Sequence, residues 1–158
     1  MLKAEPLSKG AEAPALQVTT HEGKTLDLAE AYAEGPVLVY FYPKADTPGC
    51  TAQACNLRDH FEAVKDAGIT VIGVSADGVD AQKAFAEKYH LPFTLVADHD
   101  KKLGKAFGVD SIMGRVFSRQ SFLVVDGKVV WSDLKATPDS QAQDAVAALE
   151  SYRKEHHS

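Results

Sequence analysis

Six successive apolar residues, Val37–Tyr42, constrain the fold of this 158-residue chain more than any other feature. Apolar side chains fill both odd and even positions, so the run predicts a central strand that is covered on both faces. The run ends in a loop that contains Pro43, Pro48 and Gly49. A helical pattern follows directly, and Cys50 lies where that helix begins. The stretch therefore predicts a rigid strand that presents a thiol at a helix start.

The remaining apolar patterns predict two strand–helix–strand units, then a hairpin and a final helix. Asp126-Gly127 is typical of a tight turn between paired strands, whereas residues 108–118 show no regular pattern and are expected to be irregular. The expected elements are a hairpin of 15–19 with 25–28, a short helix over 29–33, strands over 37–42, 69–75 and 93–97, helices over 51–67, 81–89 and 102–107, a hairpin of 121–125 with 128–132, and a helix from about Pro138 that ends in a frayed tail, Glu155–Ser158.

This order of elements predicts one α/β domain over residues 1–158, with a mixed central sheet, helices on both faces and an N-terminal β-hairpin. Seventeen basic residues stand against 22 acidic ones, with no basic stripe, so we expect neither nucleic acid nor a membrane as a partner. The longest apolar run is far shorter than the roughly 20 residues that cross a bilayer. The first residues lack the apolar core of a signal peptide, so we expect a cytoplasmic protein.

The chain has two cysteines, Cys50 and Cys55, which is too few for a disulfide scaffold. Such a pair is catalytic, redox-active, metal-binding, or simply two buried thiols. Zinc sites need a third and usually a fourth ligand, but there is no third cysteine and the histidines lack a paired spacing. We therefore expect no metal. The choice between reactive and merely buried thiols depends on what surrounds Cys50.

The helix start is the first feature that favours a reactive Cys50. A thiol is a nucleophile only as the thiolate, which is a minor form at neutral pH for a free cysteine with a pKa of about 8.5. Unpaired N–H groups and the positive end of the helix dipole stabilise an anion at this place. Thr47 fits as the N-cap before Pro48, but its hydroxyl could instead point into the pocket beside the sulfur.

A nearby cation is the second feature that would favour a reactive Cys50. Arg119 comes just before the predicted strand 121–125, and it borders Cys50 if that strand neighbours strand 37–42. Its guanidinium would then hold both the thiolate and a substrate oxygen in one fork. Lys44 is nearer in sequence, but its place in the loop predicts a solvated side chain.

These residues resemble the active-site signature of the peroxiredoxins, Pro-x-x-x-Thr-x-x-Cys with a distant arginine before an apolar strand. A longer string that ends at the second cysteine is similar to the bacterioferritin comigratory protein (Q-type) subgroup. The likeness runs over residues 7–152, nearly the whole chain. The resemblance rests on Pro43, Thr47, Cys50 and Arg119, and on Cys55 at the end of the string Phe41–Cys55.

The resemblance implies a thioredoxin-like fold and the reduction of hydrogen peroxide or alkyl hydroperoxides without a bound cofactor. Cys50 would be the peroxidatic nucleophile, which becomes a sulfenic acid. Thr47 and Arg119 would hold the peroxide and stabilise charge as the O–O bond breaks, and Pro43 would shield the sulfur. Cys55 would be the resolving cysteine, which forms an intramolecular Cys50–Cys55 disulfide. Thioredoxin or another dithiol would then recycle a monomeric enzyme.

Helix geometry adds a consequence for Cys50 and Cys55. Residues five apart on a helix are about 140° apart around its axis and about 8–9 Å apart between Cα atoms. A disulfide needs Cα atoms within about 7 Å. The disulfide therefore requires residues 50–57 to leave the helical conformation.

Two other functions stay open from the residues alone. A thiol–disulfide oxidoreductase usually carries Cys-x-x-Cys, which this chain lacks. A thioredoxin-like redox sensor would use the same thiols without enzymatic turnover.

Overall fold

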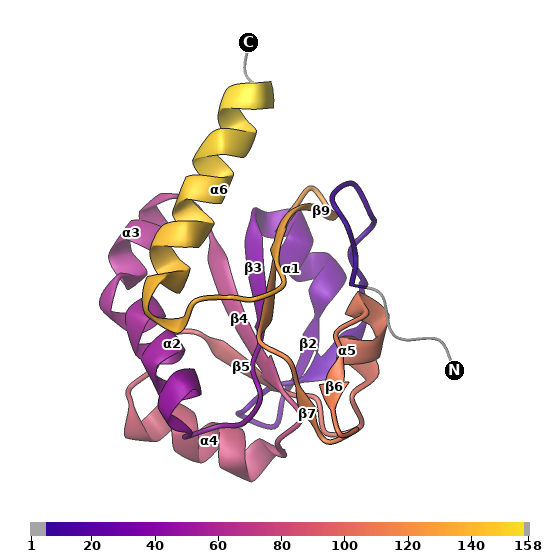
Figure 1. Ribbon diagram of the computed structural model, residues 1–158, viewed down its shortest axis with the longest axis vertical. Coiled ribbons are helices and arrows are strands. Elements are labelled where there is room, and N and C mark those ends of the chain that lie inside the picture. The colour runs from indigo at the N-terminus through magenta and orange to yellow at the C-terminus, as the bar shows by residue number, and fades with distance from the viewer. Residues whose placement is uncertain (1–5, 157–158) are drawn as a thin grey trace.

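The computed structural model describes residues 6–156, which contain a five-stranded mixed sheet with helices on both faces (Figure 1). The strand order is β5-β4-β3-β8-β9. β3, β4 and β5 run parallel, whereas β8 and β9 are antiparallel to their neighbours. The predicted α/β class is therefore confirmed. The strands are β3 Val37–Phe41, β4 Thr70–Ser75, β5 Thr94–Ala97, β8 Gln120–Val125 and β9 Lys128–Asp133.

Helices cover the two sides of this sheet unequally. Figure 1 shows α2, α3 and α6 on one side of the strands, and α1 and α5 on the other. The predicted N-terminal hairpin is present as β1 Gln17–Thr19 and β2 Thr25–Asp27. The helices are α1 Leu28–Glu34, α2 Pro48–Asp59, α3 Phe61–Asp66, α4 Val79–Lys88, α5 Lys102–Phe107 and α6 Gln141–His156, with a 3-10 turn, η1 Pro138–Ser140, before the last.

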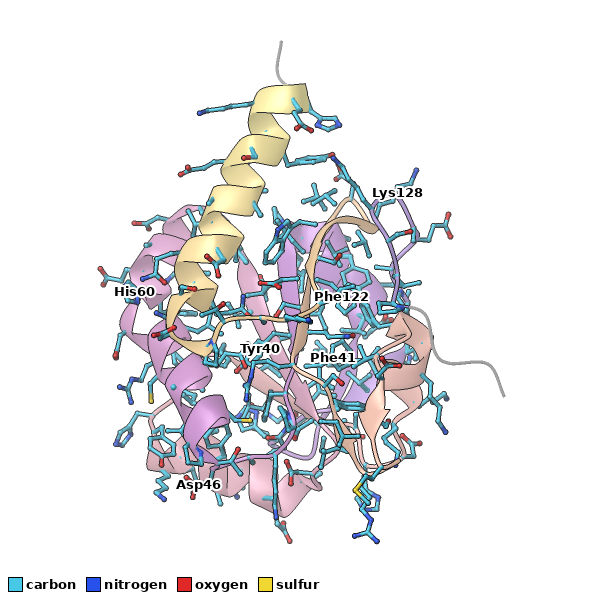
Figure 2. All side chains as sticks on the ribbon, in the orientation of Figure 1. Tyr40, Phe41, Asp46, His60, Phe122 and Lys128 are labelled. Carbon is cyan, nitrogen blue, oxygen red and sulfur yellow. The ribbon has the colours of Figure 1, made fainter. Side chains whose placement is uncertain are left out.

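Strand β3 divides the core into two clusters because its alternate side chains point to opposite faces. Every residue of β3 is buried, as the sequence predicted. Phe41 packs with residues of α1 and α5, and we call this side the first face. Tyr40 packs with residues of α2, α3, α4 and α6, and we call that side the second face. Figure 2 shows these two consecutive side chains on opposite sides of the strand.

Three segments differ from the sequence prediction. The expected helix over 51–67 is two helices, because His60 leaves helical angles at φ −108° and ψ 19° and bends the chain between α2 and α3. The segment 108–118 is not wholly irregular: β6 Ser111–Ile112 pairs with β7 Val116–Phe117, and strands of two residues leave no periodic pattern.

The predicted frayed tail is also wrong at its start. Glu155 and His156 continue α6, and the His156 ring stacks on Tyr152 with its Nδ1 2.9 Å from the Tyr152 carbonyl oxygen. The last two residues of that tail, and the first five of the chain, lie outside the described residues. Between residues 6 and 156, no helix has the length and apolar composition that crossing a membrane requires.

Candidate active site

Cys50 lies at the start of α2, under the end of the central strand. Thr47 is the N-cap, Pro48 is the first helical residue and Cys50 is the third, as the sequence predicted. The Cys50 side chain is almost fully buried, with 2% of its surface exposed. Cys55 is partly buried on the same continuous helix, and both thiols are free. The structure therefore holds the two cysteines in a reduced, helical arrangement.

Thr47 is the N-cap of α2 through its backbone only, because its side chain makes no capping hydrogen bond. The backbone of Thr47 is extended, as an N-cap requires, and its carbonyl oxygen accepts the first helical bond from Thr51 N at 2.8 Å. The hydroxyl instead donates to the carbonyl oxygen of Lys44 at 2.7 Å, which closes the loop before the helix. Because that loop is tight, the hydroxyl points back along the chain rather than toward the first N–H groups.

Arg119 reaches Cys50 because β8 lies beside β3, as the sequence argument required. Phe41 is paired with Gln120, so Arg119 stands just beyond the end of both strands. Its Nη2 lies 3.5 Å from Cys50 Sγ. Gly49 makes room for this approach, since a Cβ on Gly49 would lie 2.8 Å from the same nitrogen. Lys44, the other candidate cation, is exposed, as predicted.

Gln53 is a site residue that the sequence reasoning missed. Its side chain is fully buried, and its Oε1 accepts a hydrogen bond of 2.7 Å from Arg119 Nη1. It lies one helical turn after Cys50, among the inward-facing Ala54 and Leu57. A glutamine on the buried face of an otherwise apolar helix stripe was the available signal, because buried polar groups need a specific partner.

The loop before Cys50 is held from α4 and from the end of β4. Asp46 adopts a positive φ of 59°, and its carboxylate accepts hydrogen bonds from Lys88 Nζ at 2.8 Å and Tyr89 Oη at 2.7 Å. These bonds lower the pKa of Asp46 below its ordinary value. Asp77 adds a second tie, because its Oδ2 accepts from the backbone N–H of Ala45 at 2.8 Å. The loop that carries Thr47 is therefore fixed at two points.

Two tyrosines from the end of β3 lie in the same buried cluster as Cys50. The Tyr40 and Tyr42 rings stack with centroids 5.4 Å apart. Burial raises the pKa of both hydroxyls well above 10.0, so both stay protonated. Tyr42 donates to Gln82 Oε1, whereas the Tyr40 hydroxyl has no partner within residues 6–156. Cys50 thus shares its buried cluster with two neutral tyrosines, while its sulfur lies beside the Arg119 cation.

Two sources of positive charge lie beside the Cys50 sulfur. No carboxylate within residues 6–156 forms an ion pair with Arg119, so its charge acts on the sulfur without neutralisation. The α2 start adds N–H groups and the positive end of its dipole.

Pro43 is partly buried two residues after β3 ends. Over the described part of the chain, no three histidine, cysteine, aspartate or glutamate side chains gather as a metal site would need.

The chain is similar in sequence to known proteins. The sequence profile of the AhpC/TSA family matches residues 9–132. The chain is 46% identical over 125 residues to a chloroplastic peroxiredoxin Q of Triticum aestivum, which covers 78% of this chain and 57% of that protein. It is 43% identical over 141 residues to peroxiredoxin Bcp of Escherichia coli, which covers 84% of this chain and 90% of that one. The chain therefore spans less than three fifths of the wheat protein.

Solved structures agree with the sequence comparison. The fold is similar to peroxiredoxin Q of Xanthomonas campestris, with a TM-score of 0.80, 32% identity, and coverage of 89% of this chain and 96% of that one. It is also similar to peroxidoxin BcpB of Mycobacterium tuberculosis, with a TM-score of 0.85 and 29% identity over 92% of this chain and 97% of that one. These likenesses confirm the expected thioredoxin-like fold in the part of the chain that the structure describes.

Proposed function

Because this chain belongs to the AhpC/TSA family and, within it, to the peroxiredoxins, we propose that it is a thiol peroxidase that reduces hydrogen peroxide and alkyl hydroperoxides through Cys50. The observation that carries the proposal is the Arg119 guanidinium 3.5 Å from the buried Cys50 sulfur at a helix start. A Xanthomonas campestris relative is described as having alkyl peroxide reduction activity.

The first step is nucleophilic attack by sulfur on oxygen. The Cys50 thiolate attacks one oxygen of ROOH, the S–O bond forms and the O–O bond breaks. The products are a Cys50 sulfenic acid and, once the leaving oxygen takes a proton, ROH; sulfur loses two electrons and the peroxide gains them. Arg119 stabilises negative charge as it moves from sulfur to the leaving oxygen. Thr47 helps to hold the peroxide, and Pro43 shields the sulfenic acid.

The second step uses Cys55. Its thiolate attacks the Cys50 sulfenic sulfur, the S–S bond forms and the S–O bond breaks; the departing hydroxide takes up the proton that the Cys55 thiol gave up and leaves as water. Both residues lie within the continuous helix α2, so the helix must unwind around residues 50–57 before the sulfurs can meet. A dithiol then attacks the disulfide, which returns two thiols and oxidises the reductant.

Stopped-flow kinetics test this function. We expect peroxide to oxidise Cys50 orders of magnitude faster than free cysteine, and Cys50→Ser to abolish the reaction. Cys55→Ser is the matched control, because it removes a thiol from the same helix yet should leave the first oxidation intact and stop recycling. Oxidation at the rate of free cysteine would exclude the enzyme, and loss of the first step in Cys55→Ser would reverse the two roles.

We further propose that the enzyme acts as a monomer in the cytoplasm, with thioredoxin or a similar dithiol as reductant and with neither nucleic acid nor a membrane as a partner. Both cysteines lie on one helix of one chain, so the disulfide needs no second subunit. Mass spectrometry after one equivalent of peroxide should find an intramolecular disulfide. A disulfide-linked dimer would contradict the proposal.

A further inference from the structure

A chain of buried hydrogen bonds links Arg119 to the first residue of α6. Arg119 Nη1 donates to Gln53 Oε1 at 2.7 Å, and Gln53 Nε2 donates to Gln141 Oε1 at 2.6 Å. The hydroxyl of Ser121 donates to the same Gln141 oxygen at 2.5 Å. The side chains of Gln53, Gln141 and Ser121 are fully buried. Elements α2, β8 and α6 thus converge behind the guanidinium.

Arg119 determines which groups donate and which accept along this series of hydrogen bonds. A guanidinium has only donors, so the Gln53 oxygen must face Arg119 and its amide nitrogen must face away. That nitrogen in turn requires an oxygen from Gln141. The Gln141 amide nitrogen is then left without a partner within residues 6–156. Buried donors are rarely left unpaired, so an unpaired donor on a side chain two hydrogen bonds from Arg119 calls for an explanation.

We propose that Gln141 is a positioning residue, which through Gln53 holds Arg119 against the Cys50 sulfur. This inference rests on the proposed peroxidase function. The guanidinium is planar and rigid, so fixing Nη1 on Gln53 also fixes where Nη2 points. An unanchored Gln53 side chain would let both nitrogens shift, and small misplacements of a group that stabilises developing charge slow the reaction.

Neutral amides suit this task better than carboxylates would. A carboxylate at either glutamine would orient Arg119 but would also draw part of its charge away from sulfur. The amides orient the cation and leave that charge available to the thiolate and the peroxide. The unpaired donor on Gln141 is the cost of this arrangement.

Gln141 can be altered without releasing α6, because other contacts hold that helix start. Asn56 of α2 accepts a hydrogen bond from the Ala142 backbone N–H at 2.8 Å and donates to the Asp139 carbonyl oxygen at 3.0 Å. The side chain of Gln141 is therefore separable from the placement of its helix.

The test is single-turnover oxidation of Cys50 by hydrogen peroxide in the full chain. We expect Gln141→Met, which matches the size but lacks the acceptor, to slow the reaction about tenfold, the scale typical of lost support around a reactive group. Gln141→Glu keeps the acceptor but brings a carboxylate near the guanidinium, so its rate should lie between those of Gln141→Met and the parent, within about threefold of the parent. If Gln141→Met does not fold, Gln141→Asn, which retracts the acceptor, carries the same expectation.

The matched control is Gln82→Met, since Gln82 is another fully buried glutamine on the second face but bonds Tyr42 and Val96 instead. It should lose stability and keep its rate. A double-mutant cycle adds a second readout: in a Gln53→Met background, Gln141→Met should cause no further slowing.

Three results would each overturn the inference. They are a Gln141→Met oxidation rate within about twofold of the parent, an equal slowing of oxidation in Gln82→Met, or rate effects of Gln141→Met and Gln53→Met that add up in the double variant. Failure of the proposed function itself looks different, because the parent protein would then react no faster than free cysteine.

Discussion

The two faces of the central sheet are built from the same strands but from different kinds of side chain. The first face is mainly apolar: Phe41, Phe107 and Phe122 lie in mutual contact, with ring centroids 5.0–6.0 Å apart, and Gln120 is its one buried glutamine among the described residues. The second face buries Cys50 together with three glutamines and two tyrosines. Apolar contacts tolerate no charge but need no partners, whereas buried polar groups must be paired. We infer that the first face supplies stability and the second supplies chemistry.

The largest predicted effect is on the first face. Phe122→Ala removes a fully buried ring and should lower the free energy of unfolding by about 3–5 kcal/mol. The second-order rate constant for peroxide, measured on the folded fraction, should not change. Urea unfolding and stopped-flow oxidation on the same preparation check both values. A large rate loss at full folding would mean that the two faces are not separate.

A pair of identical substitutions gives the next largest effect. Gly104→Ala places a Cβ 2.2 Å from the buried Phe117 ring and should cost about 1–3 kcal/mol of stability, with little change in rate. Gly49→Ala meets only the Arg119 side chain, whose displacement gives up the hydrogen bond to Gln53, so stability should fall by no more than about 1 kcal/mol. The displaced guanidinium should slow Cys50 oxidation about tenfold or more. Equal stability losses at both glycines would break the comparison.

Two neighbouring tyrosines test whether pairing matters within the second face. Tyr42→Phe leaves Gln82 Oε1 without its donor and should cost about 1–3 kcal/mol. Tyr40→Phe removes a hydroxyl that has no partner within residues 6–156, so stability should stay level or rise by about 1 kcal/mol. Thermal unfolding of both variants is sufficient, and a destabilised Tyr40→Phe would contradict the account.

The smallest effects concern pH. Burial raises the pKa of Asp98 above 3.8, so its folded form binds the proton more tightly and stability falls as pH rises above that value. Hydrogen bonds from Lys88 and Tyr89 lower the pKa of Asp46, whose contribution is present above 3.8 and is lost as pH falls below it.

Urea unfolding between about pH 3 and pH 7 separates these two carboxylates. Relative to Asp98→Asn, the parent should lose stability as pH rises from 3.8. Relative to Asp46→Asn, it should lose stability only below 3.8. Reversed slopes would refute the assignment.

Local patterns predicted the sheet and the place of Cys50 beside Arg119. The run 37–42 and the Asp126-Gly127 turn indicated strands that the structure confirms, and the helix over 102–107 was located residue by residue. Adjacency of β3 and β8 then brought Arg119 to Cys50. These inferences succeeded because periodicity and strand ends are encoded over a few neighbouring residues.

Hydrogen bonds between side chains far apart in the sequence could not be predicted from local patterns. Gln53 and Gln141 are separated by 88 positions, and no spacing rule connects two glutamines on different helices. The sequence did not predict the bend at His60 or the strands β6 and β7 for another reason. These features span only one or two residues, which is too short for a periodic pattern to be counted.

Hydrogen exchange of the reduced and the peroxide-oxidised protein tests the central claim most directly, namely that the chemistry is confined to the second face. Forming the Cys50–Cys55 disulfide should abolish protection of the α2 amides over residues 50–57. Protection of α1, α5 and the strand amides should stay as it is in the reduced protein. Unchanged protection over 50–57, or a loss that spreads to both faces, would contradict the account.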